Sequence, residues 1–226
     1  MPTSAFHPVR TRRLVRDQVF DRLLESIVSG ALAPGEDIRD IDLQQEFGVS
    51  RTPIREAILR LVDLGLVEMQ TNRFTRVAAV DLSAQVQRTE AAIPLIALSA
   101  RTAGPALTDD DLRRAQLLFA QLRTLDIERH GRHEGLDLWY AVYQILVERA
   151  GNEIVSGILL DQLGPHLRRS AQNTVEPDVA AFLPVYIDQL EQLFLARDGD
   201  TIAATITAGI TQTVVVPMRR FLGTTP

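Results

Sequence analysis

The sequence contains no cysteine, no lysine and few aromatic residues, which make up 5% of the chain. Without cysteine, the chain can build neither a disulfide framework nor a thiolate metal site. Because lysine is absent, all 24 basic side chains are arginines, which we attribute to genome composition rather than to function.

Long apolar runs and enzyme motifs are also missing. No apolar run approaches the roughly 18–20 residues of a membrane-spanning helix, and the start, MPTSAFHPVRTRRLVR, lacks the apolar centre of a secretory signal. We find no Gly-rich phosphate loop, no Ser/His/Asp arrangement and no His clustered with carboxylates. We therefore predict a cytoplasmic protein that is not an enzyme and has no membrane partner. An enzyme with an accessory DNA-binding module is the least favoured alternative.

Charge is distributed unevenly along the 226 residues, whose net charge is −5. Residues 1–80 hold 11 arginines and 11 acidic residues, whereas the remainder holds 13 arginines and 18 acidic residues. A basic arm precedes the first acidic residue and contains Arg10, Arg12, Arg13 and Arg16. Phosphate binding depends on local rather than net charge, so the acidic total does not exclude a nucleic-acid partner.

The most informative stretch is 34–66, PGEDIRDIDLQQEFGVSRTPIREAILRLVDLGL. Arg51 and Arg55 are four residues apart and share one helical face. The apolar residues that recur at helical spacing on another face are Ile54, Ala57, Ile58, Leu61 and Leu64. Such a helix fits a DNA major groove, although an ordinary amphipathic surface helix is the alternative.

The neighbouring segments complete a winged helix over 12–80, after a flexible arm at 1–11. Apolar periodicity predicts helices at 14–29 and 41–47, and Gly48 supplies the turn between the second and third helices. The first turn of the third helix contains Pro53, with Ser50 or Thr52 as its hydroxyl cap. Two β-prone runs, 66–69 and 75–80, predict a hairpin whose tip is 71–74.

Residues 81–226 predict an all-α bundle of about six helices. Asp81 or Ser83 caps the first of them, and Thr108 with Asp111 opens the second. We expect a polar loop at 130–135, followed by helices over 136–150, 153–171, 177–197 and 200–222. The fold class is thus mostly α, with an N-terminal winged helix-turn-helix and a C-terminal helical bundle.

The segment PGEDIRDIDLQQEFGVSRTPIREAILRLVDLGLVEMQ resembles the DNA-binding domain of GntR-family bacterial transcription regulators. It departs at Gln44, where alanine is usual. The helical remainder resembles the effector domain of the FadR subfamily (FCD type), with Ala150-Gly151-Asn152 matching an S-G-N turn. The resemblance covers about 12–80 closely and about 83–222 more loosely.

This resemblance implies a homodimer that binds a palindromic operator in double-stranded DNA. The family's wing glycine has no counterpart among the residues at the hairpin tip. The predicted DNA-binding residues are Arg39, Ser50, Arg51, Thr52, Arg55, Thr71, Asn72 and Arg73.

The resemblance also implies an effector site, which in many members holds a metal with one Asp and three His. Here the first two of these positions fall on Trp139 and Tyr143, the third on Gln189 or Leu190, and the fourth near Thr211 or Gln212. None of these residues is a histidine or a carboxylate, so we predict that the metal has been lost and that no cofactor is needed. His130 and His133 offer a zinc alternative without an evident third ligand.

Trp139 and Tyr143 leave two interpretations open: core filling, or an aromatic ligand pocket with polar contacts from Tyr143 and Gln189. Arg88 lies near where the subfamily often has an arginine on its first effector helix, which leaves two interpretations: a partner for an acidic ligand, or an arginine that is simply exposed. The full predicted effector set is Arg88, Trp139, Tyr143, Gln189 and Thr211. We predict a repressor controlled by an organic acid or acyl compound; the alternative is a dimerisation bundle without a ligand.

Overall fold

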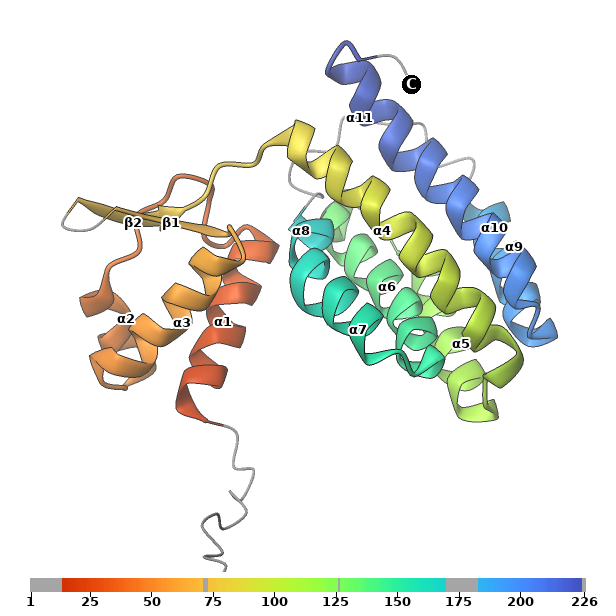
Figure 1. The fold of residues 1–226 in the computed structure, drawn as a ribbon, viewed down its shortest axis with the longest axis horizontal. Helices are drawn as coiled ribbons and strands as arrows, with labels where there is room; N and C mark the ends of the chain where they lie inside the picture. The colour runs from red at the N-terminus through yellow and green to blue at the C-terminus, as the bar shows by residue number, and fades with distance from the viewer. Residues whose placement is uncertain (1–13, 71–72, 126, 170–182, 225–226) are drawn as a thin grey trace, which may run out of the picture. The chain divides into compact units, whose positions relative to one another are not determined.

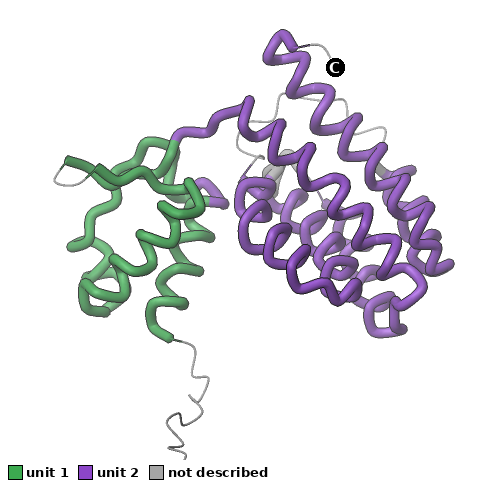
Figure 2. Tube along the Cα trace, in the orientation of Figure 1, with its two compact units in different colours: residues 1–27, 31–78 green, residues 28–30, 79–226 purple. Residues whose placement is uncertain are grey.

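The computed structural model describes residues 14–70, 73–125, 127–169 and 183–224. The predicted arm at 1–11 therefore lies outside the described residues. The chain divides into two compact units, which we call unit 1 and unit 2 (Figure 2). Unit 1 comprises Met1–Ile27 with Ala31–Ala78, and unit 2 comprises Val28–Gly30 with Ala79–Pro226.

Unit 1 contains three helices and a two-stranded hairpin (Figure 1). The helices are α1 (Val15–Ser29), α2 (Asp40–Phe47) and α3 (Arg51–Asp63). Gly48 ends α2 with φ of 67°, a left-handed conformation that favours glycine, and so turns the chain into α3. One apolar face of each helix packs into a common core that includes Leu23, Leu43 and Leu61. The predicted winged helix-turn-helix is confirmed.

The wing consists of the antiparallel strands β1 (Val67–Gln70) and β2 (Phe74–Val77). Their register pairs Val67 with Val77 and Gln70 with Phe74. The backbone before α2 joins the outer side of β2, because Ile38 N donates to Thr75 O at 2.7 Å and Val77 N donates to Glu36 O at 2.9 Å. Strand β2 therefore has hydrogen-bonded backbone on both sides: β1 on one side and the segment before α2 on the other.

Helices are the only regular secondary structure in the described residues of unit 2, and the predicted all-α fold is confirmed (Figure 1). Two long helical segments, 153–169 and 199–221, contain a π-helical stretch in the middle, η2 and η4 respectively. A π-helix has about one more residue per turn than an α-helix. The elements are α4 (Leu82–Ala103), η1 (Gly104–Ala106), α5 (Asp109–Thr124), α6 (Ile127–Ala150), α7 (Glu153–Ser156), η2 (Gly157–Leu163), α8 (Gly164–Arg169), α9 (Leu183–Ala196), α10 (Gly199–Ile210), η4 (Thr211–Val215) and α11 (Val216–Phe221).

Two predicted helix starts match the observed caps, and one predicted loop is wrong. Asp81 caps α4 by accepting hydrogen bonds from Ser83 N and Ala84 N. The expected polar loop at 130–135 is instead part of α6, which runs unbroken from Ile127 to Ala150. Glycine weakens a helix but does not end it when tertiary packing favours continuation; Gly135 lies where an added Cβ would be 3.1 Å from Leu125 Cδ2.

The continuous helical segment Gly199–Phe221 is long and apolar enough to cross a membrane by composition, with a mean hydropathy of 1.4. The expectation that no such run exists is therefore wrong. This segment packs along α4 (Figure 1) and buries Ile202, Ala203 and Ile206 completely in the core of unit 2. A helix at the core of a globular domain meets the same criterion, so this finding is weak evidence for a membrane span.

The start of α5 is held by a buried carboxylate. Thr108 and Asp111 form the predicted capping box, and Arg149 of α6 reaches the same carboxylate at 2.7 Å. Burial alone would raise the pKa of Asp111, but hydrogen bonds from Arg149 and Thr108 outweigh it and lower the pKa to about 2. Asp111 therefore joins α5 to α6 in its charged form.

Asp111→Asn is expected to lower the free energy of unfolding by about 2 kcal/mol at pH 7. The folded pKa lies below the ordinary aspartate value of 3.8, so the stabilisation is complete above about pH 4 and is lost as pH falls through about 2. Urea unfolding at pH 7 and pH 3 should show that the difference between wild type and variant shrinks to roughly half. The exposed neighbour Asp110, replaced by asparagine, is the control. An equal loss at both pH values would contradict this account.

Candidate functional site

The two arginines predicted to read DNA lie on the exposed face of α3. Arg51 and Arg55 are both exposed, one helical turn apart. The opposite face is fully used for packing, by Ile54, Ala57, Ile58 and Leu61, none of which is more than 2% exposed. The buried apolar face thus holds α3 against the core of unit 1, while the exposed face with Arg51 and Arg55 remains accessible to a partner.

The start of α3 adds hydroxyl and amide donors to this face. Ser50 occupies the N-cap position, but its side chain makes no capping hydrogen bond, so the expected hydroxyl cap is not formed. Thr52 is exposed in the first turn. The first N–H groups of a helix have no partner within the helix and attract anions. Together these groups can bind a phosphate beside Arg51.

The two arginines differ in their partners. Arg51 Nε lies 2.7 Å from Asp40 Oδ2, at the start of α2. Arg55 forms no ion pair with any residue that the structure describes. The Arg51 side chain remains 62% exposed despite its pair, so DNA can compete with the Asp40 carboxylate. Asp40 therefore orients Arg51 and at the same time reduces its positive potential.

Asp40→Asn is expected to strengthen binding to mixed-sequence duplex DNA by about threefold at low salt, because it removes a negative charge beside Arg51. The discrimination between a preferred and a scrambled duplex should fall, since Arg51 loses the partner that orients it. Fluorescence anisotropy with both duplexes measures each effect. Asp63→Asn, an exposed change at the far end of α3, is the control. Unchanged affinity for both duplexes would contradict the role of Asp40.

The remaining predicted DNA-binding residues lie around the same unit. Arg73 is exposed at the hairpin tip and donates to Gln70 Oε1 at 3.2 Å. Thr71 and Asn72 lie outside the described residues. Arg39 is exposed at the N-cap of α2, four residues before the buried Leu43. Arg76 on β2 forms an ion pair with Glu68 at 2.8 Å and is therefore less available to DNA than Arg73.

The predicted aromatic pair in unit 2 belongs to a larger cluster of rings. Trp139 stacks on Tyr143 with centroids 6.2 Å apart and contacts Tyr186 of α9 at 5.3 Å. Phe119 of α5 contacts Trp139 edge-on at 6.5 Å. Burial raises the pKa of Tyr143 well above its ordinary value, and the adjacent Tyr186 hydroxyl raises it further. These rings fill the space between α5, α6 and α9 with one another.

Two predicted effector residues have different placements. Gln189 is exposed on α9, whereas the adjacent Leu190 is fully buried, because neighbouring helical positions point about 100° apart. Gln189 therefore does not join the aromatic cluster. Thr211 is half-buried at the start of η4, and its hydroxyl donates to Thr207 O at 2.7 Å. Sequence reasoning missed Tyr186, although its spacing of four residues from Leu190 indicates the same inward face.

Arg88, also predicted, lies near a buried arginine that sequence reasoning missed. Arg169 of α8 is 3% exposed, and burial lowers its pKa, which the nearby charge of Arg88 lowers further. Gln85, one turn before Arg88 on α4, is 2% exposed, and its Nε2 has no hydrogen-bond partner among the described residues. The facing parts of α4 and α8 thus bring cationic and amide donors together inside unit 2.

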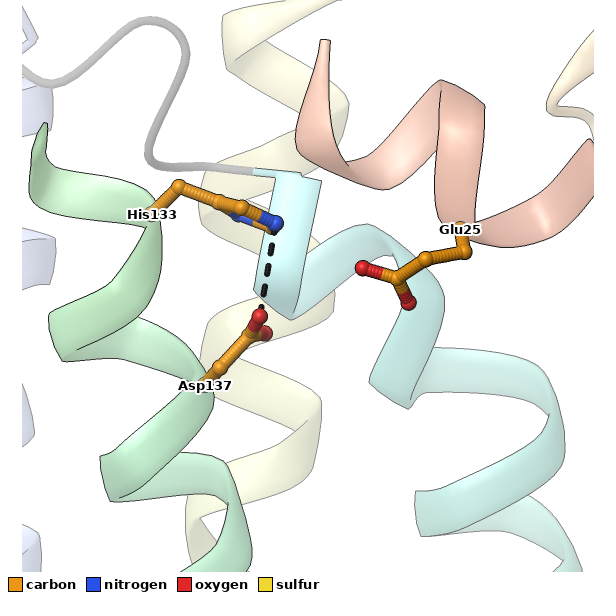
Figure 3. A group of neighbouring side chains, drawn as sticks. All are labelled: Glu25, His133 and Asp137. Carbon is orange, nitrogen blue, oxygen red and sulfur yellow. Dashed lines mark ion pairs between the residues drawn. The ribbon is translucent and has the colours of Figure 1, made fainter. Parts of the chain in front are cut away.

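His133 is the only predicted zinc candidate whose side chain falls within the described part; that of His130 lies outside it. His133 Nε2 lies 3.3 Å from Asp137 Oδ2, one turn along α6 (Figure 3). Arg168 Nε lies 2.5 Å from the other carboxylate oxygen, Asp137 Oδ1. The third side chain in Figure 3, Glu25, belongs to unit 1. In unit 2, Asp137 therefore serves as an ion-pair partner of Arg168.

Comparison with known proteins adds three findings. A family model described as bacterial regulatory proteins, gntR family, matches residues 15–77. The HTH-type transcriptional regulator Mce2R of Mycobacterium tuberculosis is 32% identical over 198 residues, which cover 78% of this chain and 76% of that protein. The HTH-type transcriptional repressor RspR of Escherichia coli is 26% identical over 196 residues, which cover 85% of this chain and 84% of that protein.

A solved structure shares the fold. That of E. coli McbR/YncC superposes with a TM-score of 0.73 at 21% sequence identity, covering 91% of this chain and 98% of that chain. The similarity thus extends over both units, beyond the 63 residues that the family model matches.

Proposed function

The chain belongs to the GntR family of bacterial regulatory proteins, and on that premise we propose a dimeric repressor whose operator binding responds to a small-molecule effector. Its relatives are transcription regulators, and its winged helix is the DNA-binding domain. The observation that carries the proposal is α3, whose basic face is open while its apolar face is completely buried.

In the proposed complex, α3 enters the major groove. Arg55 and Arg51 bind base edges and phosphates, because a guanidinium can donate two parallel hydrogen bonds to guanine or to a phosphate. Ser50 and Thr52 hydroxyls bind the adjacent phosphate at the start of the helix. Arg73 and the rest of the wing tip approach the neighbouring groove. Two copies related by a two-fold axis then bind the two halves of a palindrome.

Unit 2 is the proposed effector domain, of the FadR type, working without a metal or other cofactor. Three groups favour a ligand with an anionic group, because each offers donors inside the unit: Arg88, Arg169 and the amide nitrogen of Gln85, which has no hydrogen-bond partner in the described part of the chain. An organic acid or an acyl thioester has that chemistry together with an apolar part. Ligand binding would shift the equilibrium between arrangements of the two DNA-binding domains that do and do not fit the half-site spacing.

One observation favours a second candidate for unit 2. The rings of Trp139, Tyr143 and Tyr186 are packed against one another, which fits a bundle that only dimerises. In either case, we propose a cytoplasmic protein that is not an enzyme. The repressor assignment is supported by RspR, whose name describes a repressor and whose similarity covers 85% of this chain.

The test starts from DNA duplexes selected from a random library by the full-length protein. Selection should yield a palindrome, and light scattering should show two chains per duplex. A thermal-shift screen of organic acids and acyl thioesters, followed by titration of each hit against the protein–DNA complex, should identify a compound that releases the DNA. Failure to select any sequence would overturn the DNA-binding proposal. Tightly bound divalent metal at about one ion per chain would overturn the proposal of a metal-free domain.

A further inference from the structure

The last long helical segment of unit 2, Gly199–Phe221, is apolar but only partly covered by its own bundle. One side packs against α4 and α9, yet only 33% of its most apolar stretch of 18 residues is buried. A surface helix normally carries charged residues on its outward side. Here the exposed residues between the two ends are Thr201, Ala204, Ala208 and Gln212. The outward side of this segment is therefore uncharged.

Helix α4 extends the same surface. It runs antiparallel to the segment, because Gly104 after its end contacts Gly199 and Glu90 in its first half accepts a hydrogen bond from Arg219 Nε at 2.8 Å (Figure 1). Residues 91–100 of α4 include no charged side chain. The exposed residues in that stretch are Ala91, Pro94 and Leu98, the last of them 45% exposed. Two packed helices thus present one uncharged face.

Charges occur at the two ends of the segment. Residues 201–218 contain no charged side chain, whereas Asp200 stands directly before them and Arg219 and Arg220 directly after. The Asp200 side chain is 89% exposed, with Arg101 at 3.5 Å. Arg220 is exposed and forms no ion pair within the described ranges of the chain. At about 1.5 Å per residue, the two exposed charges of opposite sign lie about 30 Å apart.

This charge pattern is complementary to itself when two copies lie antiparallel. A two-fold axis through the middle of the segment would bring Asp200 of one chain beside Arg220 of the other. Because a two-fold interface repeats every contact, the attraction occurs twice. A parallel arrangement would instead place like charges together, which is unfavourable.

The size of the face also suits a dimer. The uncharged stretch is about 27 Å long, and two helices side by side are about 20 Å wide. The face therefore measures about 540 Å² per chain, or about 1,100 Å² for two chains, against the roughly 1,000 Å² that a specific interface needs.

We propose that two copies of this chain dimerise through the outward face of α4 and Gly199–Phe221, with the two Gly199–Phe221 segments antiparallel. This inference rests on the proposed function and deepens it, because it assigns a surface to the proposed dimer. DNA is disfavoured as the occupant, since the face has no positive charge between its ends. A membrane is disfavoured because anionic lipids would repel Asp200.

The first test exchanges the end charges in the full-length protein. Asp200→Arg and Arg220→Asp should each weaken self-association at least about tenfold, because like charges then meet at both ends. An equimolar mixture of the two variants should form heterodimers about as tightly as the wild type, since every end contact again joins opposite charges. Sedimentation equilibrium over a dilution series measures all three affinities. Failure of the mixture to recover would contradict the antiparallel arrangement.

The second test places a charge in the middle of the face. Ala208→Glu should weaken dimerisation at least about 100-fold, because the carboxylate is buried without a partner. Leu117→Glu is the matched control, at a 67% exposed apolar position of α5, and should dimerise as the wild type does. Both variants should melt near the wild-type temperature, because each changes an exposed side chain.

Two results would overturn the proposal. If Ala208→Glu dimerises as tightly as Leu117→Glu, the chains associate through another surface, and the proposed function survives. If the wild type stays monomeric and instead co-sediments with vesicles of anionic phospholipid, the face binds lipid. Failure of the proposed DNA binding looks different, since the wild type would then select no duplex even where it dimerises through this face.

Discussion

Arg55→Ala is expected to weaken binding to the selected operator by about 10- to 100-fold, with little change in folding. Arg55 forms no ion pair with any described residue, so DNA gains its full charge without first breaking a contact. A bidentate arginine–guanine contact contributes about 1–3 kcal/mol of discrimination. The exposed position of the side chain means that its removal leaves no cavity in the core.

Arg51→Ala is expected to weaken binding less than Arg55→Ala does. Arg51 must exchange Asp40 for a phosphate or base, so part of what it gains on DNA is offset by the lost pair. Which of the two variants loses more affinity therefore tests the effect of the Arg51–Asp40 ion pair, and not only whether an arginine is present. Anisotropy titrations with the selected duplex and a scrambled duplex give both the affinity and the discrimination.

The control for both is Arg113→Ala, an exposed arginine of unit 2 that should bind DNA as the wild type does. If Arg51→Ala and Arg55→Ala both retain full affinity, α3 is not the recognition helix. If Arg51→Ala weakens binding more than Arg55→Ala, the ion pair with Asp40 does not reduce the contribution of Arg51.

The winged helix could be predicted from sequence because its signals are local. Gly48 marks the turn, the apolar residues of α3 repeat at helical spacing, and a β-prone pair of runs brackets a polar tip. The ion pair of Arg51 with Asp40 could not be predicted in the same way. Its partners are 11 residues apart on different helices, and only the angle between α2 and α3 brings them together.

In the described part of unit 2, the order of the helices could be predicted, but the contents of the interior could not. The glycines and histidines of 130–135 suggested a loop, whereas packing of Gly135 against Leu125 accommodates a continuous α6. The π-helical turns η2 and η4 shift the inward face of their helices, so counting from a motif loses register there. On α9, which contains neither π-helical turn, the sequence left Gln189 and Leu190 both open, and Leu190 is the buried one of the two.

The largest expected effect on stability arises where α4 and α10 meet. Gly104 at the end of α4 and Gly199 at the start of α10 lie in close backbone contact. A Cβ added at Gly104 would lie only 2.3 Å from the Cα of Gly199, so the contact requires glycine. A Cβ added at Gly199 would lie 2.7 Å from the carbonyl oxygens of both Ala100 and Arg101. These obstacles are backbone atoms, which cannot rotate away as a flexible side chain could, so the two helices must move apart.

Gly199→Ala is therefore expected to lower the free energy of unfolding by about 3 kcal/mol, and the melting temperature by roughly 6–12 °C for a chain of this size. Gly157→Ala is the matched control, because the nearest atom to its added Cβ, Asp161 Oδ2, is 4.0 Å away. Thermal melts and urea titrations of both variants measure the difference. Equal stability of the two variants would mean that α4 and α10 can separate without cost. A selective loss at Gly199 would instead show that this crossing fixes α10, and with it Thr211 and the face of unit 2 proposed to respond to the effector.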